Sequence, residues 1–279
     1  MTPVIDTGLA DTVVLVTGAD RGIGAATALA FAAQGARVAV HHHPGTASPP
    51  PGVRFEHTPG GADEAGELVD RLVQAGAGAV ATFPADLGAP GAPRALLDAV
   101  EDELGPVLVL VNNAAHCESP DIVTELTEGV LDRTYRVNVH APALLISEVA
   151  RRRTTGGAGS PTGPEDREWL PAVINISTDA ARAFPGQLAY GTSKAALEAL
   201  TRATALDLGP LGVRVNAVAP GPVQTGWMAA DLVEQVRPSI PLRRVGDPGD
   251  IADCVVFLAS RQARWITGQV VQVAGGHAL

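Results

Sequence analysis

Short runs of β-branched and aliphatic residues alternate with helix-like segments along nearly the whole chain, and this alternation constrains the fold most strongly. Unbroken apolar runs of this length are typical of buried parallel strands. We expect strands at Thr12–Val16, Arg37–His41, Ala79–Phe83, Val107–Val111, Ala172–Ile176, Val213–Val218 and Val270–Val273. Helices are expected up to about Gln34, at Ala62–Ala75, Ala92–Leu104 and Gly129–Arg153, after Tyr190, and at Asp250–Leu258. The pattern predicts an α/β fold in which helices cover both faces of a parallel sheet.

Two segments rich in proline and glycine interrupt the alternation, at residues 42–61 and 154–171. The strand–helix alternation resumes after each of them. We therefore interpret both as surface inserts rather than as linkers between domains. The sequence predicts a single domain over residues 1–279.

Composition excludes several classes of protein. Of 279 residues, 46% are hydrophobic and 18% charged, which is enough for a sizeable core. The net charge of −10, without a long basic run, argues against nucleic acid or an anionic membrane as partner. We expect neither a signal peptide nor a membrane span, because no stretch has the necessary apolar pattern. Cys117 and Cys254 have neither metal-site nor disulfide-framework spacing, so a cytoplasmic setting is the simplest expectation.

Three glycines, Gly18, Gly22 and Gly24, lie between the first expected strand and the first expected helix. Glycine lets a backbone turn tightly and approach a pyrophosphate, whose charge is attracted to the N-terminus of the helix. The alternative is an ordinary turn. The position between strand and helix favours a dinucleotide phosphate site.

The end of the second strand bears on the choice between the two nicotinamide dinucleotides. An acidic residue there would bind the ribose 2′-hydroxyl of NAD(H), but His41, His42 and His43 occupy this position. Arg21, in the glycine turn, could pair with the 2′-phosphate of NADP(H). We therefore predict NADP(H) in preference to NAD(H). Adjacent strand residues point to opposite faces, so we expect no metal at the histidines, but adenine contacts or solvation.

Tyr190 and Lys194 are four residues apart in an expected helix, so their side chains share one face. A nearby ammonium group would lower the tyrosine pKa by roughly 1–3 units. A tyrosine of this kind can exchange a proton with a carbonyl or alcohol oxygen. On their own, a tyrosine and a lysine at this spacing are common on any helix.

Four motifs together resemble the signature of the short-chain dehydrogenase/reductases. They are Thr17-Gly18-Ala19-Asp20-Arg21-Gly22-Ile23-Gly24, Asn112-Asn113-Ala114-Ala115, Tyr190-x-x-x-Lys194 and Pro220-Gly221. The resemblance covers the chain from Thr12 to Gly276 and is strongest to the 3-oxoacyl-carrier-protein reductase and glucose dehydrogenase type. It implies a Rossmann-type, doubly wound fold with a mostly parallel, seven-stranded sheet.

The resemblance also implies catalytic roles. Tyr190 would be the general acid/base, and Lys194 would lower its pKa and hold the nicotinamide ribose. Ser177, thirteen residues before Tyr190, would bind the substrate oxygen; Thr178 takes this role if the loop is one residue shorter than usual. Asn138 would hold a water that links Lys194 to solvent. These residues could otherwise be an ordinary strand-end cap and a polar helix residue.

Further residues are implied as cofactor contacts. Asp86 and Leu87 would contact adenine, and Asn112 and Ala114 would line the adenine ribose. The nicotinamide end would be formed by Pro220, Gly221, Val223 and Thr225. The complete expected cofactor set is Gly18, Arg21, Gly22, Ile23, Gly24, His41, Asp86, Leu87, Asn112, Ala114, Tyr190, Lys194, Pro220, Gly221, Val223 and Thr225. Two positions depart from the family pattern: Ala115 replaces a glycine, and Ala274 replaces an aspartate that bears on a C-terminal subunit contact.

The expected activity is reduction of a ketone by NADPH, with a small carbonyl or alcohol compound as substrate. Oxidation of an alcohol or sugar by the same residues is one alternative, and a dinucleotide-binding redox sensor without turnover is another. Arg151, Arg152 and Arg153 could either dock an acidic carrier protein or form a solvated helix end. The family implies a homotetramer or a dimer, and the apolar stretch 265–271 suits a buried C-terminus.

Overall fold

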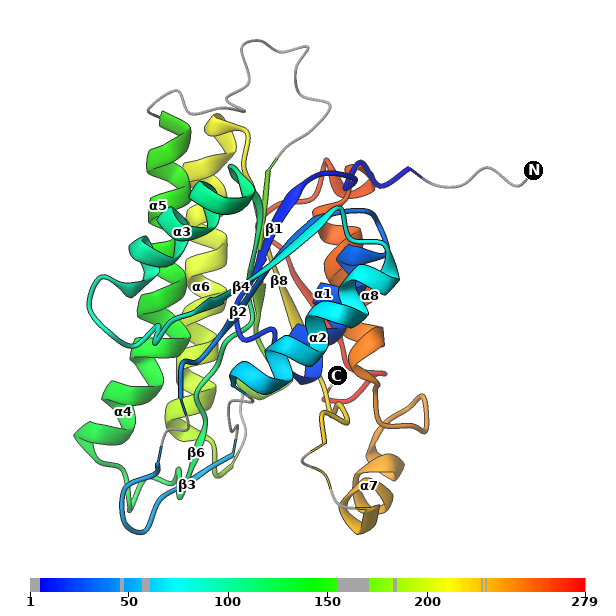
Figure 1. The fold of residues 1–279 in the computed structure, drawn as a ribbon. Coiled ribbons are helices and arrows are strands. Elements are labelled where there is room, and N and C mark those ends of the chain that lie inside the picture. Colours follow the sequence, from blue (N-terminus) through cyan, green and yellow to red (C-terminus); the bar gives the residue numbers. More distant parts are fainter. Residues whose placement is uncertain are drawn as a thin grey trace.

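The computed structural model describes residues 6–45, 48–56, 61–154, 171–182, 185–226, 228 and 230–278. In this part of the chain seven parallel strands form one sheet, in the order β4-β2-β1-β5-β7-β8-β9 (Figure 1). Their bounds are Val13–Val16 (β1), Arg37–His42 (β2), Ala79–Pro84 (β4), Val107–Asn112 (β5), Ala172–Ile176 (β7), Arg214–Pro220 (β8) and Val270–Val273 (β9). The predicted α/β fold is confirmed, and every expected strand is present.

Helices pack against both faces of the sheet (Figure 1). One face is covered by α1 (Gly22–Ala32), α2 (Ala62–Ala75) and α8 (Pro248–Ala259), and the other by α3 (Ala92–Leu104), α5 (Ala141–Thr154) and α6 (Leu188–Leu208). Alternate strand residues therefore enter two separate cores: Val14 and Val16 face α1 and α8, whereas Leu15 faces α3 and α5. Burial on both faces explains why the strands are uninterrupted apolar runs.

The helix expected over residues 129–153 is divided into three parts. It consists of α4 (Glu128–Tyr135), a π-helical turn η1 (Arg136–His140) and α5. Thr127 caps α4 by accepting a hydrogen bond from the amide of Val130 at 3.3 Å. Asn138 lies inside the π-helical turn and is fully buried. Such turns are often found at functional sites, and sequence periodicity does not reveal them.

The first insert is more ordered than the sequence suggests. Within residues 42–61, Arg54–Phe55 forms strand β3, which pairs antiparallel with β6 (Glu118–Ser119). This part of the insert thus forms a short strand at the surface. Of the second insert, residues 155–170 lie outside the described residues.

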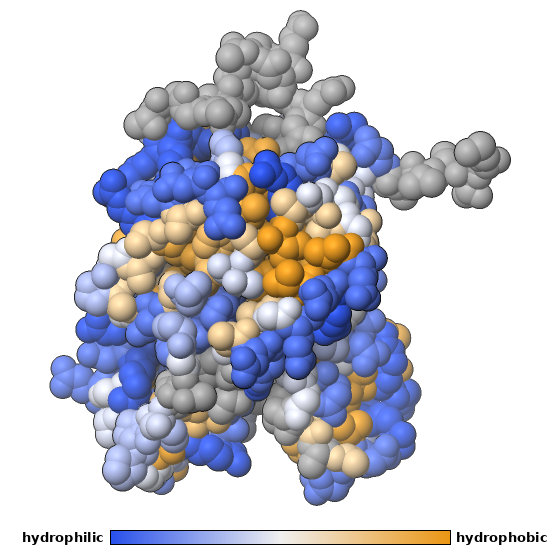
Figure 2. Space-filling view, viewed as in Figure 1, coloured by the Kyte–Doolittle hydropathy of each residue, from blue (hydrophilic) through white to orange (hydrophobic). Residues whose placement is uncertain are grey.

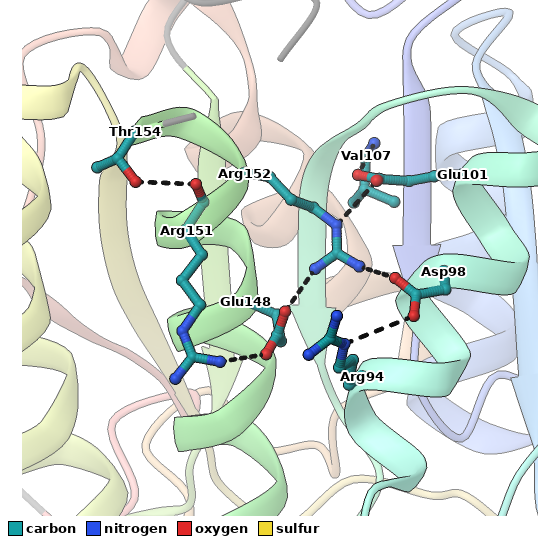
Figure 3. Close-up of polar contacts among 8 residues, drawn as sticks. All are labelled: Arg94, Asp98, Glu101, Val107, Glu148, Arg151, Arg152 and Thr154. Atoms are coloured by element: carbon teal, nitrogen blue, oxygen red, sulfur yellow. Dashed lines mark hydrogen bonds and ion pairs between the residues drawn. The ribbon is translucent and has the colours of Figure 1, made fainter. Parts of the chain in front are cut away.

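Arg152 connects α3 and α5 by ion pairs (Figure 3). Its guanidinium lies 2.8 Å from Glu101 and 3.0 Å from Glu148, and also contacts Asp98. Arg151 pairs with Glu148 at 2.7 Å. These carboxylates neutralise two arginines of the expected basic patch, which weakens the hypothesis of a docked acidic carrier.

The loops at the carboxyl ends of the strands gather at one edge of the sheet. The chain leaves β1 toward β2 on one side, and β5 adjoins β1 on the other, so the connections diverge here. Ligands of doubly wound sheets bind at such a point. Beyond this edge lie β3 and β6 on one side and α7 (Ala230–Val236) on the other (Figure 1). Figure 2 shows a notch between these two projections.

No helix in the described ranges is both long enough and apolar enough to cross a membrane.

Candidate active site

The glycine turn after β1 has a backbone conformation that residues with side chains could not adopt without strain or collision. Gly18 and Gly22 have φ angles of +60° and +55°, in the left-handed region that favours glycine. A Cβ atom at Gly24 would collide with the carbonyl oxygen of Gly18 and lie 2.6 Å from Nδ2 of Asn113. That Nδ2 donates to the carbonyl oxygens of Thr17 and Gly18, both at 2.8 Å. Asn113 thus fixes the turn, a role that the sequence analysis did not assign.

The N-terminus of α1 opens from this turn without a side-chain cap. Arg21 occupies the N-cap position and makes no capping hydrogen bond. Gly22, Ile23 and Gly24 form the first turn of the helix, whose amides lack partners within the helix. Unpaired amides and the helix dipole attract anions. The turn and the helix end therefore fit the pyrophosphate of a dinucleotide.

His41 supports the glycine turn from the interior. Its Nδ1 accepts a hydrogen bond from the amide of Gly18, and its Nε2 donates to the carbonyl oxygen of Ala85, both at 3.0 Å. Burial lowers the pKa of His41 to about 4, so the ring is neutral at physiological pH. Solvation of His41, one of the expected alternatives, is wrong because only 3% of the residue is exposed.

At the expected adenine end, Arg21 pairs with Glu64 of α2 at 3.2 Å, and both side chains are nearly half exposed. Asp86 accepts a hydrogen bond from the amide of Gly88 at 2.9 Å and lies 4.0 Å from His43. The side chain of Leu87 packs in the core between β4 and α3. Only the backbone of Leu87 is therefore available for the adenine contact that the sequence suggested.

The loop after β8 approaches the glycine turn. A Cβ atom at Gly22 would lie 3.2 Å from Cβ of Thr225, so these two predicted cofactor residues are adjacent. Pro220 ends β8, and Val223 forms a bridge with Gly246. A Cβ atom at Gly221 would lie 2.7 Å from the side chain of Ala274. Ala274 thus packs inside this chain against the loop, where a larger residue would crowd Gly221.

Other members of the predicted cofactor set lie at the end of β5. The Nδ2 group of Asn112 donates to Asn175 at 2.8 Å, and Asn175 donates to Thr201 of α6 at 2.8 Å. This buried ladder joins β5, β7 and α6. Ala114 lies against Gly18, with its Cα 3.0 Å from a Cβ built there. Asn112 therefore holds the strand ends together, while Ala114 lines the glycine turn.

Tyr190 and Lys194 lie in the first two turns of α6, at the same edge of the sheet. The Nζ atom of Lys194 is 5.8 Å from the centre of the Tyr190 ring and donates to the carbonyl oxygen of Ile176 at 2.8 Å. Burial lowers the pKa of Lys194 to about 8, whereas burial raises the pKa of Tyr190. The expected lowering of the Tyr190 pKa is not found, because desolvation of the buried phenolate, followed by the charges of Cys117 and Asp179, works against its ionisation.

Asn138 connects this helix to the segment after β5. Its Oδ1 accepts from the amide of His116 at 2.7 Å, and its Nδ2 donates to the His116 carbonyl at 2.9 Å and to Ser193 at 3.0 Å. Ser193 in turn donates to the carbonyl oxygen of Tyr190 at 2.7 Å. Ser193 thus links Asn138 to the backbone of Tyr190 through two hydrogen bonds.

Ser177 and Thr178 point to opposite sides. The Ser177 hydroxyl is buried and donates to Glu198 of α6 at 2.9 Å. Thr178 has extended backbone angles of −164° and 156°, so its side chain turns away from that of Ser177. Thr178 is partly exposed, and its hydroxyl accepts from the amide of Ala180 at 3.3 Å. This geometry favours Thr178 over Ser177 as a hydroxyl that a substrate can reach.

Residues 116–121, here termed the 116–121 segment, cross the N-terminus of α6. The Asp121 carboxylate accepts from the amides of Ala189 at 2.8 Å and Tyr190 at 3.0 Å. Glu118 pairs with His116 and Arg133. The sequence analysis assigned no role to Asp121, Glu118 or Arg133, because only the folded chain shows these contacts. Among the described residues, no group of three or more His, Cys, Asp or Glu could hold a metal ion.

Comparisons with known proteins match nearly the whole chain. Residues 60–278 match a family described as enoyl-(acyl carrier protein) reductase, and residues 12–47 match short chain dehydrogenase. A glucose and ribitol dehydrogenase homolog of Oryza sativa is 33% identical, with 96% of this chain and 86% of that protein covered. L-rhamnose 1-dehydrogenase (NAD(P)(+)) of Azotobacter vinelandii is 34% identical, with coverage of 96% and 97%.

Solved structures agree with this result. The reductase LugOII, which catalyses keto-reduction in lugdunomycin biosynthesis, has a TM-score of 0.80 and 34% identity, with 97% of this chain and 99% of that chain covered. The angucycline C-6 ketoreductase LanV with bound NADP has a TM-score of 0.80 and 32% identity, with coverage of 97% and 96%. With its seven-stranded parallel sheet and its matching relatives, the chain belongs to the short-chain dehydrogenase/reductase family of oxidoreductases.

Proposed function

We propose that this protein reduces a ketone with NADPH and that Tyr190 donates the proton. The observation that carries the proposal is the meeting of three elements at one edge of the sheet. These are the uncapped N-terminus of α1 behind a positive-φ glycine turn, the Tyr190–Lys194 pair of α6, and Asn138 bonded to the segment between them. Ketoreductases are among the similar structures.

The bound nicotinamide would supply a hydride to the carbonyl carbon. Tyr190 gives its proton to the carbonyl oxygen. Because burial raises the pKa of Tyr190, the phenol is protonated at neutral pH and suits the direction of reduction. Lys194, whose pKa lies at about 8, would hold the nicotinamide ribose and favour the phenolate left after proton transfer. Asn138 would hold a water that returns a proton through Lys194.

Thr178 is the better candidate to polarise the substrate oxygen. A donor aimed at the developing negative charge stabilises the transition state. The Ser177 hydroxyl donates a hydrogen bond to Glu198, whereas the Thr178 side chain lies on the opposite side of the backbone at the end of β7. The thirteen-residue spacing to Tyr190 favoured Ser177. If Thr178 takes the role, the loop between it and Tyr190 is one residue shorter than is usual in the family.

Arg21 favours NADP(H) over NAD(H), since its guanidinium can pair with a 2′-phosphate. It lies in the glycine turn, and His41 leaves no acidic group at the end of β2. Structures similar to this one contain NADP or NADPH.

We propose a homotetramer or dimer, with a small carbonyl or alcohol compound as substrate, in the cytoplasm. Apolar side chains support the assembly: Trp265 is 97% exposed, Leu206 79% and Phe257 45%. The tail around Trp265 is therefore not buried within the described chain, and a second subunit would cover it. Light scattering that gave a monomer would contradict this assembly.

An alternative is oxidation of a sugar or secondary alcohol by the same groups, as the names of two relatives suggest. Another is a redox sensor without turnover. Purified protein is screened with ketones, with alcohols and sugars, and with all four nicotinamide cofactors. NADPH consumption with a ketone, abolished in Tyr190→Phe while NADPH still binds, is the expected result. Binding without turnover of any compound would favour the sensor.

A further inference from the structure

His116 lies in the 116–121 segment, next to the proposed proton donor. Its backbone is held on both sides by Asn138, which also binds Ser193 beside Lys194. Its neighbour Cys117 is close enough to influence the pKa of both Tyr190 and Lys194. Farther along, Asp121 binds the amide of Tyr190. The His116 backbone is therefore linked, through Asn138 and Ser193, to the helix that carries Tyr190 and Lys194.

The imidazole is fixed in one orientation. Its Nε2 atom lies 2.7 Å from Oε2 of Glu118, whose side chain is only 1% exposed. The ring of Phe55, from the first insert, packs edge-on against it with centroids 4.8 Å apart. The pairing of β3 with β6 holds Phe55 there. A rotamer fixed by packing and by a hydrogen bond is what a binding group requires.

Glu118 does not need His116 for neutralisation. Arg133 donates from Nη2 to Oε1 at 2.7 Å and from Nε to Oε2 at 3.0 Å, a two-pronged pair. Burial works against ionisation of Glu118, but the hydrogen bonds from Arg133 and His116 outweigh it and lower its pKa. An ionised carboxylate only accepts, so Nε2 of His116 carries a proton, and in that tautomer of the uncharged imidazole Nδ1 is the acceptor.

Nδ1 makes no hydrogen bond to any described residue, and 15% of the His116 side-chain surface is exposed, so a ligand can approach the ring. Among the described residues, the ring contacts Glu118 through the Nε2 hydrogen bond and Phe55 through edge-on packing. The geometry points to His116 as a substrate-binding residue: we propose that Nδ1 accepts a hydrogen bond from a hydroxyl group near the reacting carbon. The inference rests on the proposed oxidoreductase function and adds the substrate class, a hydroxylated ketone or its polyol.

The test compares matched substrates that differ by one hydroxyl. The ketone pairs are acetoin with butanone and hydroxyacetone with acetone, and the sugar pair is glucose with its deoxy analogue, in the corresponding direction. For each pair the ratio of kcat/KM values is measured in the wild type and in His116→Leu. The expected wild-type ratio favours the hydroxylated member, and His116→Leu lowers that ratio about tenfold, as loss of one hydrogen bond predicts.

His116→Asn is the matched control, because its amide oxygen can accept near the position of Nδ1. It should keep most of the preference, whereas a role confined to the hydrogen bond with Glu118 would lower kcat/KM equally for both substrates of a pair in both variants. Equal loss for both members, or a wild type without preference, would overturn the inference and leave the oxidoreductase function intact. If the wild type turns over no compound, the proposed function itself fails. Thermal unfolding confirms that each variant is folded.

Discussion

The carboxylate of Asp121 accepts a hydrogen bond from the backbone amide of Tyr190 at 3.0 Å and another from Ala189 at 2.8 Å. Asp121 is buried and belongs to the 116–121 segment, far from Tyr190 in sequence. It thereby caps the helix that carries the proposed proton donor and fixes where that helix begins. Positioning of this kind matters, because a small displacement of a reacting group can cost a large factor in rate.

We therefore expect Asp121→Ala to lower kcat as well as stability. Loss of the cap should cost about 1–2 kcal/mol of unfolding free energy, and Tyr190 should shift with the helix end. Thr127→Ala is the control, since it removes the cap of α4 away from Tyr190. Urea unfolding should show similar losses for both variants, but only Asp121→Ala should lower kcat. An equal effect on kcat would contradict the positioning role.

The raised pKa of Tyr190 can be measured directly. The chain contains two tyrosines, so in Tyr135→Phe the phenolate absorbance reports Tyr190 alone. Without cofactor, Tyr190 should remain protonated beyond pH ~10, the usual tyrosine pKa. The double variant Tyr135→Phe/Tyr190→Phe gives the baseline. Ionisation clearly below that pH would show that Lys194 dominates over burial.

Lys194 should reduce stability at neutral pH. Its pKa is about 8 in the folded protein and 10.5 when unfolded, so the unfolded state binds more protons between these values. The free energy of unfolding must then rise by about 3 kcal/mol as the pH increases across this window. The same stability is lost again as the pH falls to the folded-state pKa of about 8. Lys194→Met removes the buried charge. It should be inactive, yet at pH 7 at least as stable as the wild type in urea unfolding, with a smaller rise up to pH ~10. A clear loss of stability at pH 7 would show that the hydrogen bond to Ile176 outweighs the burial of the charge.

Thr178 and Ser177 can be separated by single substitutions. Thr178→Val keeps the shape of the side chain and removes the hydroxyl, so kcat should fall about 100-fold. Ser177→Ala removes the bond to Glu198 and should cost about 1 kcal/mol of stability with a much smaller change in kcat. The reverse order of the two kcat values would return the role to Ser177.

The pair of Arg21 and Glu64 should tune cofactor preference. Arg21→Ala should lower kcat/KM for NADPH at least about tenfold, the loss of one charge-assisted bond, and change NADH little. Glu64→Gln removes a competitor of the 2′-phosphate and should improve NADPH use up to about fivefold at low salt. High salt should diminish the gain, because these side chains are exposed. Equal changes in kcat/KM for NADH would show that neither residue affects binding of the 2′-phosphate.

Much of the fold could be predicted because it rests on local signals. The expected strand Ala172–Ile176 agrees with β7, and Val270–Val273 agrees with β9. The long helix was predicted, but not its π-helical turn, in which Asn138 bonds to His116 of a distant segment, because helical periodicity does not reveal such turns. Strands β3 and β6 were missed, since each has two residues and gains its hydrogen bonds only from the other.

The sequence by itself determined the layered sheet, the glycine turn and the Tyr190–Lys194 spacing, because periodicity and turn chemistry act within a few residues. Only the tertiary structure decided the direction of the Tyr190 pKa, since desolvation depends on everything packed around the ring. The same holds for Ser177, which Glu198 engages from the next helix, and for Asp121, which reaches Tyr190 across the segment after β6. Burial and partners from distant segments set these properties, and no local pattern encodes which distant segments will meet.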